Sequence, residues 1–284
     1  MTKTFSTRPS NEPKRHIDCY VCGSAERRMF WQIESASYVK CKKCGFVYQY
    51  PQPVPDALAG RYDDSYFEYE IENESNFFDL MLKGLNDIRF FDELESLIKV
   101  KRILDIGCAT GKLLSFFKSR GWDAYGIEIC HQSAEYARKN YGLEILETPV
   151  ESVDIENEYF GFIHSSHVIE HVPSPVAFLS AIYRLLVPGG YAVIVTPNVE
   201  GFQALLLREK WRSAIPDHTF LFSKHTLLSI LEKQGFEIVA WKTWGGIAKG
   251  IVPTFIKKPF DIMAKLLGFG DVMLFLIRKP TVDL

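Results

Sequence analysis

The sequence lacks long apolar runs and has almost no net charge. No stretch reaches about 18 uninterrupted apolar residues, the length that a membrane-spanning helix needs, and no apolar run near Met1 has the form of a signal peptide. The 33 Lys and Arg residues nearly balance the 35 Asp and Glu residues, so no global positive field attracts nucleic acid. Fixed-period repeats and low-complexity tracts are also absent. We therefore expect a soluble, cytoplasmic protein without a membrane-spanning segment.

Cysteine is scarce, and four of the 6 cysteines form two identical pairs. Cys19-Tyr-Val-Cys22 and Cys41-Lys-Lys-Cys44 are each followed by glycine. Two such pairs can supply the four thiolates of a tetrahedral, structural zinc ion. Disulfides are the alternative, but the missing export signal argues against an oxidising compartment. The sequence thus predicts a zinc ribbon with Cys19, Cys22, Cys41 and Cys44 as ligands.

The segment that organises the chain is Arg102 to Gly111, RILDIGCATG. An apolar strand over 102–106 leads into a turn of small residues that begins at Gly107, and the helical pattern that follows ends at Gly121. Glycine lets a backbone approach a ligand closely, and a helix N-terminus offers free N–H groups. Strand, turn and helix are the first unit of a nucleotide-binding α/β domain.

A second strand, AYGIE, ends in Glu128, on the order of twenty residues beyond the turn. An acidic side chain in this place can accept hydrogen bonds from both ribose hydroxyls of an adenosine group. The spacing differs from the dinucleotide pattern Gly-x-Gly-x-x-Gly, and no phosphate-binding Lys-Ser/Thr pair follows the turn. The pattern therefore predicts an adenosine-binding site of another kind.

Strand and helix patterns alternate from residue 102 onward, which implies an α/β fold with a doubly wound, mostly parallel sheet. The expected strands are 102–106, 123–128, 143–147, 159–165, 190–196, 236–243 and 271–278. The expected helices are 111–120, 131–140, 176–186 and 224–234, with a further long helix or a pair of helices in 75–99. We divide the chain into a leader and zinc ribbon (1–50), a connector and helical cap (51–99) and the α/β domain (100–284).

These segments resemble the class I S-adenosylmethionine-dependent methyltransferases over roughly residues 75 to 284. The matching stretches are DIGCATG (105–111), Glu128, HSSHVIEHVPSP (164–175) and LLVPGGYAVIVTPN (185–198). The resemblance implies a Rossmann-like, seven-stranded sheet whose last strand is antiparallel. Ala109, where the family more often has glycine, and Gly161, where aspartate is common, depart from the family pattern. The ribbon and the aromatic, Pro-rich run after it resemble a bacterial subgroup often associated with methylating sugars, glycans or other small molecules.

The resemblance also implies which residues contact S-adenosylmethionine. They are Asp105, Gly107, Cys108, Ala109, Gly111, Glu128, Ile129, Val150, Ser165, Ser166 and His167. Glu128 would bind the ribose, Asp105 would orient the methionine amine, and Ile129 would lie against adenine. Because Pro149 replaces the usual acid beside adenine, Val150 would offer only its backbone.

Methyl transfer from a sulfonium is a direct displacement, so the protein positions the acceptor and removes its proton. We expect the base near the carboxyl ends of the fourth and fifth strands. His171 is the first candidate, with Glu170 holding its tautomer or binding substrate, because this Glu-His pair matches small-molecule members of the family. His218, in a later Pro-containing loop, is the second. The alternative, which we weigh equally, is that Glu170 and His171 only cap the loop and hydrogen-bond the backbone.

Two further segments concern partners. Tyr62, Tyr66, Phe67 and Tyr69 could form an aromatic lid over the active site, or only pack between domains. Residues 251–269 alternate apolar residues with lysines, as in a basic amphipathic helix that rests on an anionic membrane surface. Such a segment more often packs on the sheet or forms a dimer.

The function we expect is methylation of a small molecule, a sugar or a lipid-linked glycan. The first alternative is a zinc-ribbon RNA methyltransferase, since residues 1–44 carry nine Lys and Arg against four Asp and Glu. Against RNA, residues 56–99 carry twelve Asp and Glu against four Lys and Arg, and no Asn-Pro-Pro-Tyr tetrad for base methylation is present. The second alternative is a non-catalytic, cofactor-binding scaffold.

Overall fold

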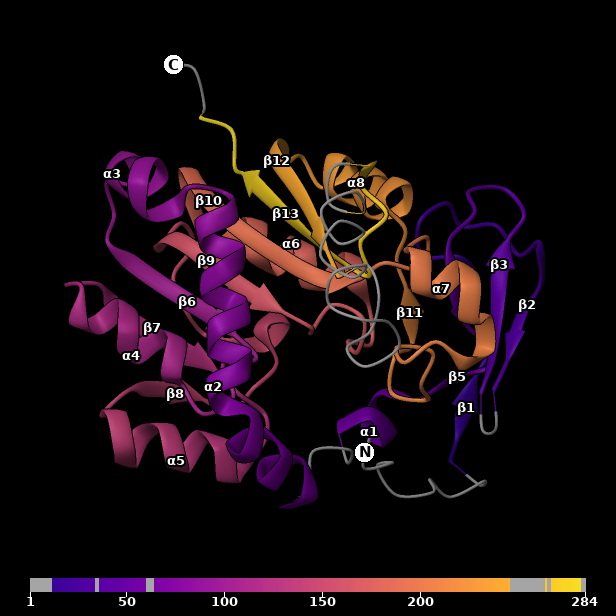
Figure 1. Ribbon diagram of the computed structural model, residues 1–284, viewed down its shortest axis with the longest axis horizontal. Coiled ribbons are helices and arrows are strands. Elements are labelled where there is room, and N and C mark those ends of the chain that lie inside the picture. The colour runs from indigo at the N-terminus through magenta and orange to yellow at the C-terminus, as the bar shows by residue number, and fades with distance from the viewer. Residues whose placement is uncertain (1–11, 34–35, 60–63, 246–263, 265–266, 282–284) are drawn as a thin grey trace, which may run out of the picture.

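The centre of the protein is a seven-stranded sheet with the strand order β12-β13-β10-β9-β6-β7-β8 (Figure 1). The computed structural model describes residues 12–33, 36–59, 64–245, 264 and 267–281. The strands are β6 (Arg102–Ile106), β7 (Asp123–Ile127), β8 (Glu144–Leu146), β9 (Phe160–Ser166), β10 (Leu186–Pro197), β12 (Glu237–Trp244) and β13 (Val272–Arg278). Neighbours from β8 to β10 are parallel, and β13 is antiparallel to both β10 and β12. The predicted doubly wound sheet is confirmed.

Helices cover both faces of this sheet because its central strands alternate apolar side chains between the faces. On one face lie α2 (Asp64–Asp87), α4 (Lys112–Ser119) and α5 (His131–Tyr141), packed against β9 through residues such as Phe162. On the other lie α6 (Pro175–Leu185) and α8 (Lys224–Lys233), packed against Ile163. The strand order reverses between β6 and β9, and ligands of open α/β sheets bind at the carboxyl ends beside such a reversal.

Several elements differ from the sequence-based expectation at their ends or were not expected. The helix expected within 75–99 begins at Asp64, ends at Asp87 and is followed by a π-helical turn, η1 (Phe90–Leu94), and α3 (Glu95–Leu97). Strand β10 begins at Leu186, and its pairing with β9 is irregular between Leu186 and Tyr191. Short elements without a sequence signal are β1 (Lys14–Arg15), α1 (Pro55–Ala59), η2 (Val150–Ser152), α7 (Phe202–Leu207), η3 (Arg208–Lys210) and β11 (Phe220–Leu221).

The cysteine-rich part shares a sheet with the α/β part. Strands β2 (Arg27–Gln32), β3 (Ser37–Cys41) and β4 (Val47–Gln49) form an antiparallel sheet whose fourth strand is β11. Phe220 pairs with Tyr48 and Leu221 with Val47, while β1 pairs with β5 (Gln52–Pro53). This sheet, at the right of Figure 1, is therefore completed by a segment that comes about 170 residues later in the chain. The domain boundaries at 50 and 99 stay a prediction.

Side chains of the antiparallel sheet also hold the loop that precedes β11. The Tyr38 hydroxyl is buried 2.7 Å from the carbonyl oxygen of Ile215 and 2.6 Å from that of His218, so the two carbonyls share its single proton. The Gln49 amide donates to the carbonyl oxygens of Pro216 (2.8 Å) and His218 (2.9 Å). The loop from Ile215 to His218 thus takes its shape from the cysteine-rich part.

The segment predicted to contact a membrane, 251–269, lies outside the described residues except for 264 and 267–269. Membrane contact through it stays a prediction. Within the described ranges, no helix is long and apolar enough to cross a membrane.

We expect Tyr38→Phe to lower the free energy of unfolding by about 1–3 kcal/mol, because the substitution leaves two buried carbonyl oxygens without this donor. Urea denaturation followed by circular dichroism measures the change. Tyr191→Phe is the matched control, since Tyr191 is half-buried and its hydroxyl has no hydrogen bond among the described residues. Equal stability of the two variants would show that Tyr38 does not hold the loop.

Candidate functional site

The turn after β6 is shaped by residues in the left-handed region of φ. Gly107 has φ +72°, Ala109 +47° and Gly111 +79°. A Cβ atom on Gly107 would lie 2.4 Å from Val168 Cγ2, and one on Gly111 would lie 2.6 Å from Leu143 Cδ1. Both glycines are therefore required by backbone conformation and by close packing. Ala109, which departs from the family pattern, adopts the left-handed conformation as well.

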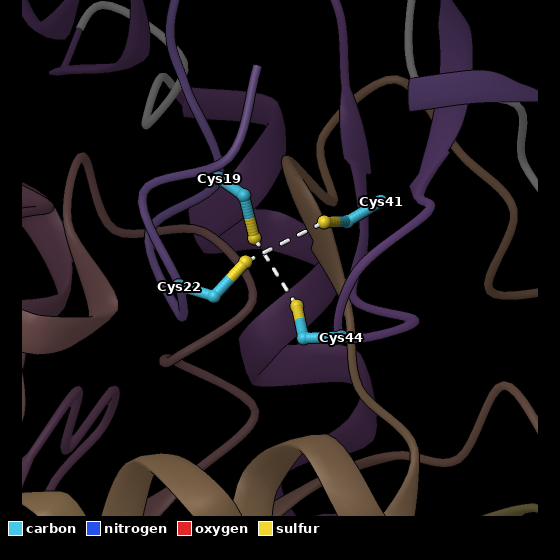
Figure 2. A group of neighbouring side chains, drawn as sticks. All are labelled: Cys19, Cys22, Cys41 and Cys44. Atoms are coloured by element: carbon cyan, nitrogen blue, oxygen red, sulfur yellow. Dashed lines mark hydrogen bonds between the residues drawn. The ribbon is translucent and has the colours of Figure 1, made fainter. Parts of the chain in front are cut away.

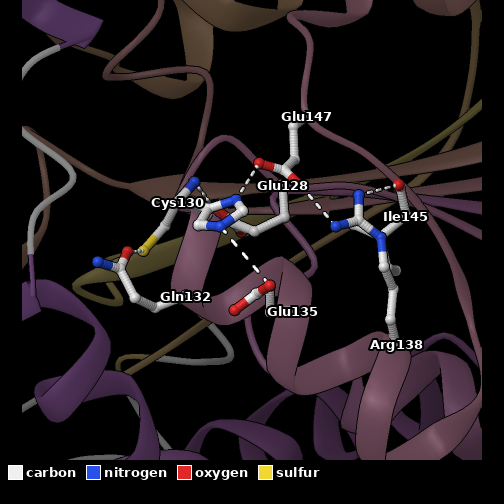
Figure 3. A network of polar contacts seen from close by, with 8 residues as sticks. Glu128, Cys130, Gln132, Glu135, Arg138, Ile145 and Glu147 are labelled. Atoms are coloured by element: carbon white, nitrogen blue, oxygen red, sulfur yellow. Dashed lines mark hydrogen bonds and ion pairs between the residues drawn. The ribbon is translucent and has the colours of Figure 1, made fainter.

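Glu128 lies directly after β7 and joins two backbone segments through its buried carboxylate. Its Oε2 accepts a hydrogen bond from the N–H of Ala109 at 2.9 Å. Its Oε1 accepts one from the N–H of Cys130 at 2.8 Å (Figure 3). Burial raises the pKa of Glu128 to about 7, and the charge of Asp105 adds to this against the lowering effect of the backbone hydrogen bonds. The acid predicted for the ribose thus lies beside the turn.

A second acid nearby, Glu147, belongs to a different network. Arg138 donates to Glu147 Oε1 at 2.5 Å and to the carbonyl oxygen of Ile145 at 2.6 Å, and His131 Nδ1 lies 2.7 Å from Glu147 Oε2 (Figure 3). These partners fix the end of β8 against α5. Of the two acids, Glu128 is the one whose carboxylate contacts the turn.

The two residues predicted to contact adenine differ in exposure. Ile129 is 40% exposed, which leaves its side chain accessible to a planar ring, while Val150 is buried in η2. Their contacts with adenine stay predictions.

The ends of β6 and β9 carry a buried carboxylate–imidazole pair. Asp105 Oδ1 lies 2.7 Å from His164 Nδ1, and neither side chain is appreciably exposed. Burial raises the pKa of Asp105, although the neighbouring His164 lowers it. Sequence reasoning gave Asp105 a role toward the methionine amine but did not predict this partner. The adjacent Ser165 hydroxyl is buried and has no hydrogen-bond partner among the described residues.

Helix α2 crosses this end of the sheet and brings further acids to it. Glu74 accepts from Lys112 Nζ at 3.0 Å and from the Tyr141 hydroxyl at 3.1 Å, and the rings of Phe67 and Tyr136 are 6.0 Å apart. One turn earlier, burial raises the pKa of Glu70 to about 7, and the charge of Glu128 raises it further. Sequence reasoning missed Glu70, because an acid on a long acidic helix carries no signal that it is buried.

Tyr66, Phe67 and Tyr69, three of the four aromatic residues predicted as a lid, also belong to α2. Tyr62 lies outside the described residues. Whether these rings cover a bound ligand stays a prediction.

A cluster of imidazoles and carboxylates follows β9. One ligand atom each of Glu170, His171 and His218 lies within 4.8 Å of the others, which brings the three predicted catalytic residues together. The Nδ1 atoms of His171 and His218 lie 3.0 Å and 2.8 Å from the carbonyl oxygens of Asp217 and Ser213. Because a carbonyl oxygen can only accept, both Nδ1 atoms carry hydrogen.

The two histidines of the cluster differ in burial. His218 is 7% exposed, and burial together with the neighbouring His171 lowers its pKa to about 3. Its ring stays neutral near pH 7. His171 is only half-buried, and the two rings pack edge to face with their centroids 4.7 Å apart.

The loop that leads to His218 is anchored by a buried acid. Trp211 Nε1 donates to Asp271 Oδ1 at 2.6 Å, and Arg212 Nε donates to Asp271 Oδ2 at 2.8 Å. Trp211 is buried, so this residue of the loop packs in the interior. The loop is thus fixed at Asp271 and again by Tyr38 and Gln49.

Comparison with known proteins assigns the chain that carries this site to a protein family. A family model described as a methyltransferase domain matches residues 81–240, more than half of the chain. The chain belongs to the methyltransferase family. Its strand order, Gly107–Gly111 turn and Glu128 are those of class I S-adenosylmethionine-dependent methyltransferases, so the family predicted from the sequence is confirmed.

Curated relatives of this methyltransferase include ubiquinone biosynthesis O-methyltransferases. That of Roseobacter denitrificans is 37% identical over 102 residues, which are 34% of this chain and 41% of the relative. That of Bordetella avium is 28% identical over 150 residues, 50% of this chain and 58% of the relative. The chain thus spans about half the length of the curated relatives it matches.

Solved structures agree in fold. A methyltransferase of Archaeoglobus fulgidus superposes with a TM-score of 0.54 at 20% identity, over 76% of this chain and 100% of the other. A possible histamine N-methyltransferase of Thermotoga maritima gives 0.52 at 22% identity, over 75% and 97%. At these identities the likeness concerns the fold alone.

The residues at the end of the sheet fit the family's cofactor. Ribose hydroxyls are hydrogen-bond donors, and the buried Glu128 carboxylate, whose pKa is raised, would be stabilised in its charged form by two further donors. The unpartnered Ser165 hydroxyl offers another polar contact, and the turn lets the backbone approach a ligand. When bound there, S-adenosylmethionine supplies an electrophilic methyl group.

Glu128→Ala is expected to weaken the binding of S-adenosylhomocysteine by about 1–3 kcal/mol, through the lost hydrogen bonds to the ribose. Isothermal titration calorimetry measures the affinity. Glu147→Ala, in the neighbouring network, serves as the control and should change the affinity little. An unchanged affinity in Glu128→Ala would mean that the ribose binds elsewhere.

The raised pKa of Glu70 predicts a pH-dependent stability. The Glu70 carboxyl stays protonated up to about pH 7 in the folded state, but only up to about pH 4.5 in the unfolded state. The stability that this protonated group contributes is therefore fully present below pH 4.5 and is lost as the pH rises through 7. Glu70→Gln cannot lose a proton there, so at pH 8 it should be more stable than the wild type by about 1–3 kcal/mol. Near pH 4.5 the two should be alike.

Thermal denaturation across pH 4.5–8 tests this, with Glu68→Gln, exposed on the same helix, as the control. Parallel curves for the wild type and Glu70→Gln would contradict a buried, titrating Glu70.

Proposed function

We propose that this protein transfers a methyl group from S-adenosylmethionine to a hydroxyl or amine of a small molecule, a sugar or a lipid-linked glycan, with a histidine as base. The observation that carries the proposal is the juxtaposition at the reversal between β6 and β9. On one side the turn and Glu128 would form an adenosine site, and on the other three histidines surround Glu170, with His171 and His218 converging on it and His167 hydrogen-bonded to it. A methyl donor and a proton acceptor are the two things that the reaction needs.

Two comparisons support this acceptor class. The relatives from Roseobacter denitrificans and Bordetella avium are named O-methyltransferases of ubiquinone biosynthesis, so a small-molecule hydroxyl is an acceptor known among similar chains. The intact turn and the buried Glu128 support cofactor binding, and the convergence of Glu170, His171 and His218 supports catalysis over a non-catalytic, cofactor-binding scaffold.

The RNA alternative receives less support from the structure. Arg15 donates to the carbonyl oxygen of Pro173 at 3.1 Å, and Arg27 donates to that of Ile17 at 2.8 Å while its guanidinium lies over the Tyr50 ring. These cations of the cysteine-rich part are used inside the protein, which reduces what a phosphate backbone could contact.

We further propose that Cys19, Cys22, Cys41 and Cys44 bind one structural zinc ion. Their side chains point at a common centre (Figure 2), with Sγ atoms 3.4 Å apart in the pair Cys19–Cys44 and 3.6 Å in Cys22–Cys41. Thiolates bound tetrahedrally at about 2.3 Å from zinc are roughly 3.8 Å apart, whereas disulfide sulfurs are about 2.0 Å apart. The four free thiols therefore have the spacing of a metal site.

Backbone N–H groups favour a thiolate at one of the four cysteines. Burial raises the pKa of the Cys41 thiol, but hydrogen bonds from the N–H groups of Cys44 and Lys43 outweigh it and bring the pKa to about 7, whereas burial outweighs such bonds at Cys19 and Cys44 and raises the pKa of both thiols. A thiolate is the form that binds zinc. The ion would rigidify the sheet that holds the Ile215–His218 loop, and so would act on the acceptor side without taking part in the reaction.

The test is titration of the purified protein with S-adenosylhomocysteine, alongside elemental analysis of the same sample. We expect one bound nucleoside and one zinc per chain, and we expect Cys22→Ser to lose the zinc and to unfold at lower temperature. Acceptor screening with radiolabelled cofactor on phenols, sugars and lipid-linked glycans follows. A wild type that binds no S-adenosylhomocysteine would contradict the proposed function. A metal-free protein that is as stable as the metal-containing one would contradict the structural zinc site.

A further inference from the structure

We propose that His167, oriented by Glu170, is the group that takes the proton from the acceptor, in place of His171 or His218. The inference rests on the proposed function and names the base of that same site. The family resemblance of the sequence had implied only a contact of His167 with the cofactor.

His167 and Glu170 form a hydrogen-bonded pair of an exposed ring with a buried acid. His167 Nδ1 lies 3.1 Å from Glu170 Oε1, and Glu170 Oε2 accepts from the Thr196 hydroxyl at 2.9 Å. The Glu170 side chain is 1% exposed and that of His167 is 47% exposed. The acid is therefore fixed inside the protein while the ring reaches solvent.

The protonation of this pair follows from its electrostatics. Burial alone would raise the pKa of Glu170, but the hydrogen bond and charge of His167 outweigh burial and hold the pKa below its ordinary value. An ionised carboxylate only accepts hydrogen bonds, so His167 Nδ1 carries the hydrogen. In the neutral ring Nε2 then holds the lone pair, which is the form that a general base requires.

The position of His167 places this ring at the cofactor turn. In the parallel pairing of β6 with β9, Ile106 lies opposite Ser165, so the residues just after each strand, the turn and His167, face one another. Val168, the next residue, packs against the turn, with its Cγ2 only 2.4 Å from where a Cβ of Gly107 would be.

The backbone at His167 has φ +58°, a conformation that non-glycine residues rarely adopt. Its N–H donates to the carbonyl oxygen of Val195 at 2.9 Å, which fixes the residue between β9 and β10. Uncommon backbone conformations of this kind cluster at functional sites.

The other two histidines are less suited to accept a proton. His218 is almost fully buried, so a charged ring there would lose hydration without solvent access. His171 Nδ1 is bound to the carbonyl oxygen of Asp217, a neutral acceptor that stabilises an imidazolium less than a carboxylate does. Both rings are better placed to shape the acceptor side. Their contacts with the Ser213–His218 loop give them that role.

The proton then follows a short path. As the acceptor oxygen or nitrogen bonds to the methyl carbon and the carbon–sulfur electron pair passes to sulfur, the acceptor proton moves to His167 Nε2. The imidazolium is stabilised by Glu170, and Glu70 from α2 also acts on His167 electrostatically. Because the ring is half exposed, the proton can pass to solvent. Glu170 is thus a positioning residue, and His167 is the catalytic one.

The first measurement is long-range ¹H–¹⁵N NMR of the imidazoles in histidine-labelled protein at pH 8, with His167→Gln for assignment. We expect His167 to show the Nδ1–H tautomer in the wild type and to lose this preference in Glu170→Gln. His171 in the same spectra is the internal control, since its Nδ1 partner is a backbone carbonyl. A wild-type His167 with hydrogen on Nε2 would overturn the proposal.

The second measurement is methyl transfer to 3,4-dihydroxybenzoate, a probe with phenolic hydroxyls, by the wild type, His167→Ala and His171→Ala. Loss of a general base should lower turnover by about 10²–10⁴-fold in His167→Ala, measured at saturating S-adenosylmethionine so that a lost cofactor contact does not enter the comparison. Added imidazole should partly restore His167→Ala. A larger loss in His171→Ala would overturn the proposal. If the probe is not methylated, the tautomer of His167 in the NMR spectra decides whether the assignment of the base stands.

These outcomes are separate from those of the proposed function. A wild type that binds no S-adenosylhomocysteine contradicts the function. Normal binding together with the wrong tautomer of His167 contradicts only the assignment of the base.

Discussion

The hydrogen bonds of the Glu128 carboxylate hold together the part of the structure on which the site depends. One oxygen binds the turn after β6 at Ala109, and the other binds the chain after β7 at Cys130. Both contacts are buried, so losing the carboxylate would leave two N–H groups without partners in a low-dielectric region. The same acid is the one that the cofactor's ribose would meet. On the proposed function, this one side chain would serve both structure and ligand recognition, at a place where burial raises its pKa.

The acceptor side depends on a different constraint, which is the joining of two distant parts of the chain. Strand β11 completes the sheet of the cysteine-rich part, while Tyr38 and Gln49 bind the carbonyl groups of the loop before it. His218 reaches His171 only because this loop is held. The cysteine-rich part thus shapes the loop before β11 through one backbone pairing and two side chains, and on the proposed function this loop borders the acceptor.

The histidines show how burial separates residues of one type. His164, His167, His171 and His218 lie within about fifty-five residues, yet each has a different partner: a buried aspartate, a buried glutamate and two backbone carbonyls. The partner and the access to solvent decide whether a ring can hold a proton. The match of the Glu170-His171 pair to the family made His171 the first candidate, whereas the carboxylate partner favours His167.

The sequence by itself determined the order of the strands and helices, the glycine turn, Glu128 and the four cysteines. These features are local, since they depend on the spacing of apolar residues, on the conformational freedom of glycine and on the placement of an acid after a strand. The sequence also named Glu170, His171 and His218 as candidates, but in two separate segments that only the fold brings together.

Tertiary structure alone decided the rest. Strand β11 is two residues long and has no pattern of its own, so only its pairing with β4 defines it. Glu70 is one acid among many on α2, and only packing buries it beside Glu128. The hydrogen bond of His167 with Glu170 depends on a left-handed backbone at residue 167. Each of these features arises where separate elements meet. Such contacts leave no periodic pattern of apolar residues and no bias in composition that could be recognised in a single sequence.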